Sequence, residues 1–509
     1  MGMATSYSAQ LVGLDSRIIT VEVDISNGLN SFSIVGLGDR AVIEAKDRIS
    51  AAIKNTGFIS PKQKNQKVII SLAPADMHKE GPSFDLAMTI AYLAAAGDIE
   101  LDPERKLLLG ELSLEGNLRK VTGILPMLCQ APAHGFTSAF IPKDNETEAS
   151  LAQGITIYAV RSVQEVIGHL TGSVRLTPIL QGIITPDDTG KSTGQSSDMS
   201  DIRGNETAKR GLEIAAAGAH NIIMCGPPGT GKTMLAHGFS SILPDLSYEH
   251  AVEVTCVHSA ADILAQGLIT KPPFRAPHHT ASYPAVIGGG SIPRPGEITL
   301  AHRGVLFLDE FPEFDRSVIE ALRQPLEERS VTISRARATL TFPAQCILIA
   351  SMNPCPCGLG KDHGCTCPEH VFKAYRRRLS GPIMDRIDIW ATVAKVDYEK
   401  LSARHVSSEN SITIRSRVSK ARSRQYKRFK EKGISLCYNS EMGAREIEIC
   451  SILSDDARST LKLSAEKMGL SGRAFHRVIK VAQTIADLAA SDLVEKGHIL
   501  EALQYREKI

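Results

Sequence analysis

Aromatic residues and an excess of charge of either sign are both scarce in this sequence. Phe, Trp and Tyr make up 5% of the 509 residues, with a single Trp. Stacking of bases on aromatic rings is therefore not expected to dominate any nucleic-acid interface. Lys and Arg number 58 against 56 Asp and Glu, a formal net charge of +2. This balance excludes a chain-wide basic field, so a nucleic-acid site must be a local patch.

Long hydrophobic runs and an export signal are also missing. The longest apolar candidate, Leu86 to Gly97, is shorter than the roughly 18 residues of a spanning helix and is interrupted by Thr89 and Tyr92. Residues 1–15 lack the basic start and apolar stretch of a signal peptide. We therefore expect a cytoplasmic protein without a membrane partner, in which the ten cysteines stay mostly reduced.

The chain divides at a small, polar stretch without apolar periodicity, Gly190 to Ser200 (GKSTGQSSDMS), which is typical of a linker. A length of 509 residues corresponds to roughly three domains. We expect a first domain over 1–175, a linker over 176–200, an α/β domain over 201–396 and a mostly helical domain over 397–509.

Hydrophobic periodicity predicts several elements within these domains. Ile18–Val23 and Val68–Leu72 are short runs rich in β-branched residues and are expected to be strands. Ala41–Ile53 carries an apolar stripe of helical spacing, and Phe84–Ala96 is typical of a buried helix. A further stripe over 478–488 predicts a helix near the end of the chain.

A phosphate-binding loop is the most specific motif. Residues 226–233 (GPPGTGKT) match G-x-x-x-x-G-K-[ST], with an apolar strand, Ile222–Cys225, before them and a helix expected over Met234–Ser240. Backbone N–H groups of such a loop surround phosphate oxygens at a helix N-terminus. Lys232 is expected to reach the β- and γ-phosphates of ATP, and Thr233 to ligate Mg²⁺. The expected nucleotide-binding residues of the loop are Gly226, Pro227, Pro228, Gly229, Thr230, Gly231, Lys232 and Thr233.

An acidic strand end supplies the matching partner. Val305–Leu308 is an apolar run that ends at Asp309 and Glu310. Asp309 would hold Mg²⁺ through water as part of the nucleotide site, and Glu310 would polarise the attacking water as a general base. Alone, such a run is often only a strand that enters a loop. The phosphate loop favours the catalytic interpretation.

Two further polar residues fit an ATP-hydrolysing site. Asn353 follows an apolar strand expected over Ile347–Met352, and its side chain can orient the attacking water or simply cap a turn. Arg386 follows a turn, and its guanidinium can stabilise transition-state charge in a neighbouring subunit. The alternative for Arg386 is a surface ion pair with Asp385.

Together these motifs resemble the AAA+ ATPases related to the magnesium chelatase ATPase subunit, and within them the ComM/YifB group. The resemblance covers nearly the whole chain and implies a P-loop α/β domain followed by a helical lid. It implies that Asn353 is sensor 1, that Arg386 is the arginine finger and that Arg473 is sensor 2, acting on the γ-phosphate of its own subunit, with Arg477 as the rival. Such ATPases work as rings, usually hexamers. Besides the motifs above, the resemblance rests on residues 208–218 (AKRGLEIAAAG), 275–279 (RAPHH), 295–298 (PGEI), 353–358 (NPCPCG) and 470–473 (LSGR).

Four cysteines form two C-x-C pairs separated by seven residues: Cys355, Cys357, Cys365 and Cys367. Thiolates at this spacing can close a tetrahedral zinc site. The stretch between the pairs has almost no apolar content, so a metal would supply its order. Reduced free cysteines or an oxidised pair are the alternatives, and His363 and His370 are substitute ligands. The resemblance to the ComM/YifB group fits a zinc-binding insertion.

The N-terminal part resembles an α+β Lon protease domain through residues 79–86 (KEGPSFDL) and 110–116 (GELSLEG). Ser83 takes the catalytic serine position, whereas the lysine position falls at or beside Leu125, and Lys120 lies five residues short of it. A serine without a base is not an activated nucleophile. We expect an inactive structural or DNA-guiding scaffold, in which Ser83 caps the helix that begins near Phe84.

Two basic segments are candidates for DNA contact. Residues 329–342 predict a β-hairpin with Arg335 and Arg337 at its tip, and in related ATPases a hairpin before sensor 1 enters the central channel. The other candidate is the basic run 415–432, whose inner stripe includes Val418 and Phe429. Charges on either segment can equally be solvated surface.

The sequence therefore predicts an ATP-driven ring motor on DNA with ATP, Mg²⁺ and Zn²⁺ as cofactors. The resemblance implies a helicase that drives branch migration during natural transformation and homologous recombination. Its implied partners are single-stranded or branched DNA, five further copies of the chain and recombination proteins. The alternative is an ATPase chaperone for metal insertion, which predicts a partner subunit and has no need of Arg335, Arg337 or the zinc insertion. An ATP-dependent protease is disfavoured by the missing lysine.

Overall fold

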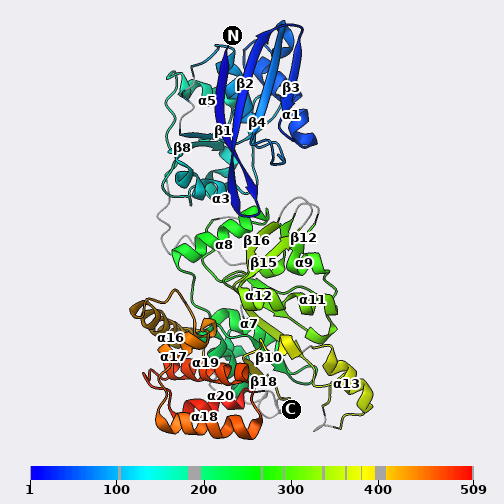
Figure 1. Cartoon of the computed structure of the whole chain (residues 1–509), viewed down its shortest axis with the longest axis vertical. Coiled ribbons are helices and arrows are strands. Elements are labelled where there is room, and N and C mark those ends of the chain that lie inside the picture. Colours follow the sequence, from blue (N-terminus) through cyan, green and yellow to red (C-terminus); the bar gives the residue numbers. More distant parts are fainter. Residues whose placement is uncertain are drawn as a thin grey trace. The chain divides into compact units, whose positions relative to one another are not determined.

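The computed structural model describes residues 2–100, 102, 105–180, 197–264, 267–290, 293–334, 339–360, 364–379, 381–395 and 409–506 (Figure 1). These residues form two compact units. The first comprises the described residues of Met1–Lys191 together with Ala251–Ile269, and the second those of Ser192–His250 and Thr270–Ile509. The inclusion of 251–269 in the first unit is a feature that the linear division of the sequence did not predict. Most of the expected linker, 181–196, lies outside the described residues.

A seven-stranded mixed sheet forms the centre of the first unit, with the order β3-β4-β2-β1-β5-β8-β9. β2 pairs antiparallel with both β1 and β4, and the other neighbouring strands are parallel. A separate pair, β6 and β7, is antiparallel. The strand bounds are β1 Met3–Val12, β2 Asp15–Asn27, β3 Ser31–Val35, β4 Gln66–Ala73, β5 Lys106–Leu108, β6 Glu111–Leu112, β7 Leu118–Arg119, β8 Ser138–Pro142 and β9 Thr156–Val160. The two strands predicted here are confirmed as β2 and β4.

The helices of this unit are α1 Arg40–Asn55, α2 Asp85–Ala95, α3 Ile124–Gln130, α4 Glu146–Ala149, α5 Val163–Leu170 and most of α8 Tyr248–Ala260. The two predicted helices are confirmed as α1 and α2, and α2 is buried on almost every side because its sequence is apolar all round. The prediction that Ser83 caps α2 is wrong. Phe84 is the N-cap, without a side-chain cap bond, and the Ser83 carbonyl instead accepts from Gly110 N at 3.0 Å.

A five-stranded parallel sheet forms the centre of the second unit, with the order β11-β14-β17-β10-β18. The phosphate loop follows β10, the acidic pair follows β14 and Asn353 follows β17, so three neighbouring strands end at one edge of the sheet. The strand bounds are β10 Ile222–Cys225, β11 Phe274–Arg275, β14 Val305–Leu308, β17 Ile347–Met352 and β18 Ile389–Thr392. Ligand sites of open parallel sheets lie at this carboxyl edge.

The five-stranded sheet, together with eight helices and two small hairpins of the described residues, forms what we call the sheet domain of the second unit. The helices are α6 Glu206–Gly218, α7 Lys232–Ile242, α9 Tyr283–Ile287, α10 Glu297–Leu300, α11 Arg316–Ala321, α12 Arg323–Glu328, α13 Glu369–Arg377 and α14 Gly381–Met384. The hairpins are β12 Gly288–Gly289 with β13 Arg294–Pro295, and β15 Ser330–Ser334 with β16 Thr339–Pro343. The second is the predicted hairpin. Its tip, with Arg335 and Arg337, lies outside the described residues.

The C-terminal part is helical and shares one hydrophobic core with the sheet. Its helices are α16 Ser411–Glu431, α17 Ala444–Cys450, α18 Asp455–Met468, α19 Gly472–Leu488 and α20 Lys496–Gln504. Val418 of α16 and Val478 of α19 belong to the same buried cluster as Ile222 of β10. The predicted inner stripe of α16 is buried. The helical region therefore packs directly on the sheet that carries the phosphate loop. No helix in the described parts of the chain is long and apolar enough to cross a membrane.

Candidate nucleotide-binding site

The phosphate loop joins the end of β10 to the start of α7. Gly229 and Gly231 adopt φ values of +76° and +86°, which glycine reaches without steric cost. A Cβ on Gly226 would lie 2.1 Å from the carbonyl oxygen of Val393, so only glycine fits there. The loop lines a cavity of about 380 Å³. The side chains of Lys232, Thr233 and Asp309 in its lining suit a phosphate-bearing ligand with its metal ion.

Lys232 points back across its own loop. Its Nζ donates to the carbonyl oxygens of Gly226 and Pro227 at 2.7 and 2.9 Å and to Asn353 Oδ1 at 3.1 Å. Burial lowers the pKa of Lys232, and the nearby carboxylate of Asp309 acts in the opposite direction. The ammonium is thus held at the cavity by neutral oxygens that a phosphate group can replace.

Asp309 occupies the position expected of a magnesium-binding carboxylate. Thr233 Oγ1 donates to Asp309 Oδ2 at 3.0 Å, and Ser351 Oγ donates to Asp309 Oδ1. A hydroxyl and a carboxylate are oxygen ligands of the kind that Mg²⁺ takes in nucleotide sites. The donor set therefore fits the ion. Ser351, at the end of β17, fixes the carboxylate and was not anticipated from the sequence.

Glu310 faces the cavity from a strained turn. Its φ is +51°, an uncommon conformation for a residue with a side chain. The backbone N–H of Glu310 donates to Ser351 Oγ at 3.3 Å, which ties the turn to β17. His279 Nδ1 lies 3.3 Å from Glu310 Oε2. His279 belongs to the motif 275–279, but motif reasoning assigned it no role beside Glu310, which lies 31 positions further on.

Asn353 meets the phosphate loop through the contact with Lys232, and both residues line the same cavity. Tyr375 of α13 donates its hydroxyl to the carbonyl oxygen of Asn353 at 3.1 Å. Burial raises the pKa of Tyr375, so the phenol keeps its proton and remains a donor. The structure thus brings together the phosphate loop, both acidic residues and Asn353.

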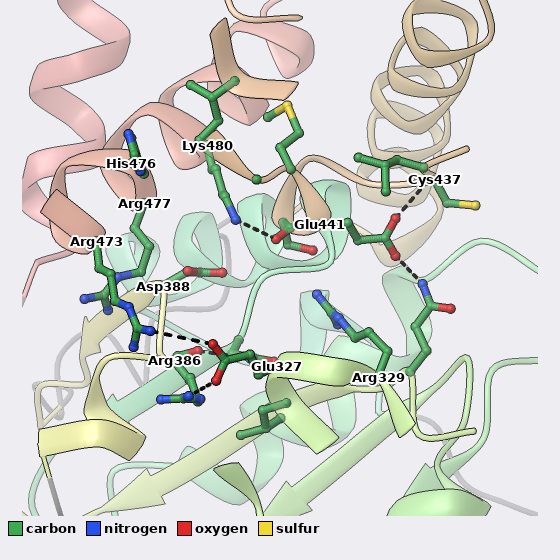
Figure 2. A pocket seen from close by; sticks show the side chains of 18 of the residues that line it. Glu327, Arg329, Arg386, Asp388, Cys437, Glu441, Arg473, His476, Arg477 and Lys480 are labelled. Carbon is green, nitrogen blue, oxygen red and sulfur yellow. Dashed lines mark hydrogen bonds and ion pairs between the residues drawn. The ribbon is translucent and has the colours of Figure 1, made fainter. Parts of the chain in front are cut away.

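Arg386 and Arg473 lie elsewhere. Among the described residues, the lining of the nucleotide cavity includes neither of them. They line a separate cavity of about 660 Å³ between the sheet domain and the C-terminal helices (Figure 2). Arg386 donates to Glu327, and Arg473 Nη2 lies 3.7 Å from another oxygen of the same carboxylate. The expected role of Arg473 on the nucleotide of its own chain stays a prediction.

The surroundings of Arg386 are crowded with positive charge. Burial lowers its pKa, and so do the neighbouring guanidinium groups of Arg473, Arg323 and Arg477. Arg477 is engaged by Asp385 at 3.0 Å, so the alternative surface pair between Asp385 and Arg386 does not form. Arg477 also donates to two backbone carbonyl oxygens and is itself buried. These contacts make Arg477 a structural residue and leave Arg473, with 64% of its side chain exposed, as the accessible arginine of the pair.

The four cysteines of the insertion converge. The Sγ atoms of Cys355, Cys357, Cys365 and Cys367 all lie within 4.8 Å of one another, and three of the Sγ–Sγ distances are 3.2, 3.5 and 3.6 Å. Four thiolates around zinc at about 2.3 Å would be about 3.8 Å apart in a tetrahedron. The donor set fits Zn²⁺. His363 lies outside the described residues, and His370 is not a member of the cluster.

The cysteine insertion also touches the phosphate loop. A Cβ on Gly358 would lie 2.7 Å from Cδ of Pro228, and Gly358 has a φ of +82°. Gly358 therefore packs closely against Pro228 of the loop. Pro228 in turn lines the nucleotide cavity.

Comparison with known proteins matches the chain along nearly its whole length. Family models described as "Magnesium chelatase, subunit ChlI", "Subunit ChlI of Mg-chelatase" and "Magnesium chelatase, subunit ChlI C-terminal" match residues 198–401, 21–145 and 408–506. Competence protein ComM of Haemophilus influenzae is 40% identical over 516 residues, which cover 100% of this chain and 98% of that protein. Uncharacterized protein YifB of Escherichia coli is 41% identical over 512 residues, covering 99% and 97%.

The chain belongs to the ComM/YifB family of magnesium chelatase-related proteins. An AAA+-type ATPase is the activity class of this family, consistent with the phosphate loop and the acidic strand. A weaker similarity, 28% identity over 160 residues, links the chain to Lon protease of Acinetobacter baumannii and covers 30% of this chain. In this ComM/YifB family member, Leu125 is fully buried and Lys120 is paired with Asp262 at 3.7 Å. Neither position offers Ser83 the missing base.

The basic helix α16 of this ComM/YifB protein uses many of its cations internally. Arg428 binds Asp487 at 2.7 Å, Arg417 binds Glu213 at 2.6 Å, and Arg422 donates to the carbonyl oxygen of Ala216 at 2.7 Å. The arginines therefore anchor α16 to the rest of the second unit. Composition alone could not separate this role from a DNA-binding face, because the partners lie far away in the sequence.

Proposed function

We propose that this protein is an ATP-driven ring motor that acts on DNA, with each ATP site completed by a neighbouring copy of the chain. The observation that carries the ring is the separation of two half-sites. The nucleotide cavity holds Lys232, Asp309, Glu310 and Asn353, whereas Arg386 lies with Arg473 in a separate cavity. An arginine that lies away from the nucleotide cavity of its own chain can stabilise charge on the nucleotide of a neighbouring chain.

The roles of the cavity residues follow from their contacts. Lys232 binds the β- and γ-phosphates, and Thr233 and Asp309 hold Mg²⁺, which supplies charge stabilisation at the phosphates. Glu310 polarises the attacking water, with His279 orienting its carboxylate. Asn353 follows β17, contacts Lys232 at 3.1 Å and orients the attacking water beside the γ-phosphate. Arg386 and Arg473 enter from the neighbour and neutralise charge that develops on the γ-phosphate.

Other observations support the proposal that DNA is the substrate. The hairpin β15–β16 precedes β17 directly in the chain, as expected for a channel loop that carries Arg335 and Arg337. A full-length relative bears the name Competence protein, and competence is the capacity for DNA uptake. Because the net charge is only +2, DNA contact must come from a few focused cations. In this proposal the arginines at the hairpin tip contact DNA phosphates, and the motor drives branch migration.

The supporting parts have structural roles in this proposal. The four cysteines bind one Zn²⁺ and hold the insertion against Pro228. The first unit is a scaffold without protease activity, because Ser83 has no lysine partner. Recombination proteins are the partners that a branch-migration motor requires.

The test is ATP hydrolysis with and without single-stranded DNA, followed by branch migration on a four-way junction. We expect DNA to stimulate hydrolysis in the wild type. The double variant Arg335→Ala/Arg337→Ala should keep its basal hydrolysis and lose both stimulation and strand movement. The affinity of the double variant for DNA should also fall less steeply with salt concentration. The difference should correspond to up to roughly two released counterions per engaged subunit.

A matched control is Lys427→Ala/Lys430→Ala, which removes two positive charges from the exposed side of α16 without touching the hairpin. This control should move junctions like the wild type. A wild-type protein that ignores DNA would instead support a metal-insertion ATPase, which needs a partner subunit rather than a polymer. Motor activity lost in the α16 control but not in the hairpin variant would place the DNA on α16.

A further inference from the structure

Glu327 holds the two arginines that the proposed function assigns to a neighbouring subunit. It lies in the last turn of α12, on the wall of the 660 Å³ cavity, and both of its carboxylate oxygens are engaged (Figure 2). Oε2 accepts from Arg386, and Oε1 lies 3.7 Å from Arg473 Nη2. One carboxylate therefore joins Arg386, two residues after the end of α14, to Arg473 at the start of α19.

The contact with Glu327 holds the Arg386 side chain against its own chain. Only 11% of the Arg386 side chain is exposed, and its Nη1 donates to the carbonyl oxygen of Pro382 at 2.6 Å. Arg386 Nε is buried without a hydrogen-bond partner. A guanidinium that is to reach another molecule must leave this position, and leaving it requires the pair with Glu327 to break.

Charge explains why an anion is needed at this point. Arg323, Arg473 and Arg477 surround Arg386, and like charges at short range repel one another. Arg477 already has Asp385 as its partner. Glu327 supplies the negative charge that allows Arg386 and Arg473 to approach each other. A terminal phosphate offers the same recognition, since guanidinium groups bind carboxylate and phosphate oxygens in similar geometry.

We propose that Glu327 is a latch. In a chain that has not assembled, its carboxylate binds Arg386 and Arg473. During ring assembly, the γ-phosphate of a neighbouring copy's ATP replaces the carboxylate as the partner of these two arginines. The inference rests on the proposed function, because it assumes that Arg386 and Arg473 act in the neighbour's site. Glu327 does not line the nucleotide cavity and is a positioning residue. Its effect is to make ring closure depend on bound ATP, since an empty neighbour offers nothing to replace the carboxylate.

The chain provides a matched control for this latch. Glu328 follows Glu327 in α12 but accepts from Gln324 at 2.7 Å rather than from an arginine. Glu327→Gln keeps the shape of the side chain and removes its charge, and because 53% of that side chain is exposed the change should not disturb folding. Glu328→Gln makes the same chemical change one residue further on.

The experiment measures ATP hydrolysis per subunit over a range of protein concentrations. For Glu327→Gln we expect the half-maximal concentration to fall by about tenfold, which corresponds to about 1.4 kcal/mol, with the plateau rate near that of the wild type. Glu328→Gln should follow the wild-type curve. A residue with a merely structural role would raise the half-maximal concentration or lower the plateau. Glu327→Ala, a second variant without the carboxylate, should shift the curve in the same direction as Glu327→Gln.

One further variant separates this inference from the function on which it rests. Arg386→Ala alone should lose hydrolysis at every concentration; if it hydrolyses ATP normally, both the trans role and the latch are wrong. If Arg386→Ala is inactive but Glu327→Gln and Glu327→Ala assemble like the wild type, the latch is wrong and the ring proposal stands.

Discussion

Lys232 and Glu310 line one cavity but perform separable tasks. Lys232 contacts neutral oxygens that a phosphate can replace, whereas Glu310 stands on a strained turn beside His279. Strained backbone at such a position is maintained by the surrounding structure and is typical of functional sites. The two residues should therefore fail in different ways when changed.

We predict that Lys232→Ala weakens ATP binding, because the loop loses the cation that meets the β- and γ-phosphates. Glu310→Gln should bind ATP normally and hydrolyse it about 10²- to 10⁴-fold more slowly, since the attacking water loses its general base. Binding of a fluorescent ATP analogue and steady-state hydrolysis distinguish the two. Glu313→Gln, three residues further on and outside the cavity lining, should behave as the wild type. Wild-type hydrolysis by Glu310→Gln would refute the assignment.

At this residue scale, motif spacing predicted Lys232, Asp309 and Asn353, because the chemistry fixes their order along the chain. The spacing could not predict Ser351 or His279, which reach the carboxylates only after β14 and β17 have paired. It also could not predict Glu327. That residue matches no motif, and its partners lie 59 and 146 positions away.

At the scale of elements, helix α16 shows how a basic composition can serve internal packing. Asp487 of α19 is fully buried and accepts from Nη1 and Nη2 of Arg428 and from Asn439 Nδ2. Lys427, the preceding residue, is 78% exposed and reaches only Glu431, at 3.8 Å. Adjacent cations on one helix therefore differ in function.

We predict that Arg428→Ala lowers the free energy of unfolding of the second unit by about 3 kcal/mol, because it leaves the Asp487 carboxylate buried without its cation. Lys427→Ala should change stability by less than about 0.5 kcal/mol. Chemical denaturation followed by circular dichroism measures both. Equal effects of the two substitutions would mean that the buried pair contributes no more than an exposed one.

The cysteine insertion is a second element whose order depends on something besides its own packing. The stretch between the cysteine pairs has almost no apolar content, but Gly358 packs against Pro228. We predict one Zn²⁺ per chain in protein purified without chelator, measured by elemental analysis. Well under one zinc per chain would count against the site.

Replacement of Cys365 and Cys367 by Ser should release the metal and increase proteolysis around residue 360. ATP should still bind, because β10 and α7 build the phosphate loop independently, although more weakly as the support at Pro228 is lost. Cys437→Ser, outside the cluster, is the control and should retain the zinc. Intact resistance to proteolysis after metal loss would show that packing alone orders the insertion.

At the scale of the whole molecule, the sequence predicted the α/β core and the helical C-terminal part because their periodic patterns are strong. It did not predict that 251–269 would join the first unit. This segment continues directly from the sheet domain in the chain, and only long-range packing assigns it: Cys256 and Leu268 lie against the cluster of Leu107 and Leu128. The amino-acid composition of 251–269 does not indicate that this segment packs in the first unit.

The central claim is that two chains make one ATP site. The measurement that tests it most directly is hydrolysis by mixtures of two inactive variants, Lys232→Ala and Arg386→Ala, over a range of ratios. A mixed interface pairs the intact cavity of one subunit with the intact arginines of the other, so activity should rise to a maximum at intermediate ratios. Arg473→Ala should complement Lys232→Ala in the same way.

Mixtures of Lys232→Ala with Glu310→Gln are the control, because both defects lie in the same half-site and no interface is repaired. Subunit exchange is checked by energy transfer between labelled chains. The account predicts recovery in the first mixtures and none in the control. Inactivity at every ratio of Lys232→Ala and Arg386→Ala, with exchange demonstrated, would contradict the claim that Arg386 acts on a neighbour's nucleotide.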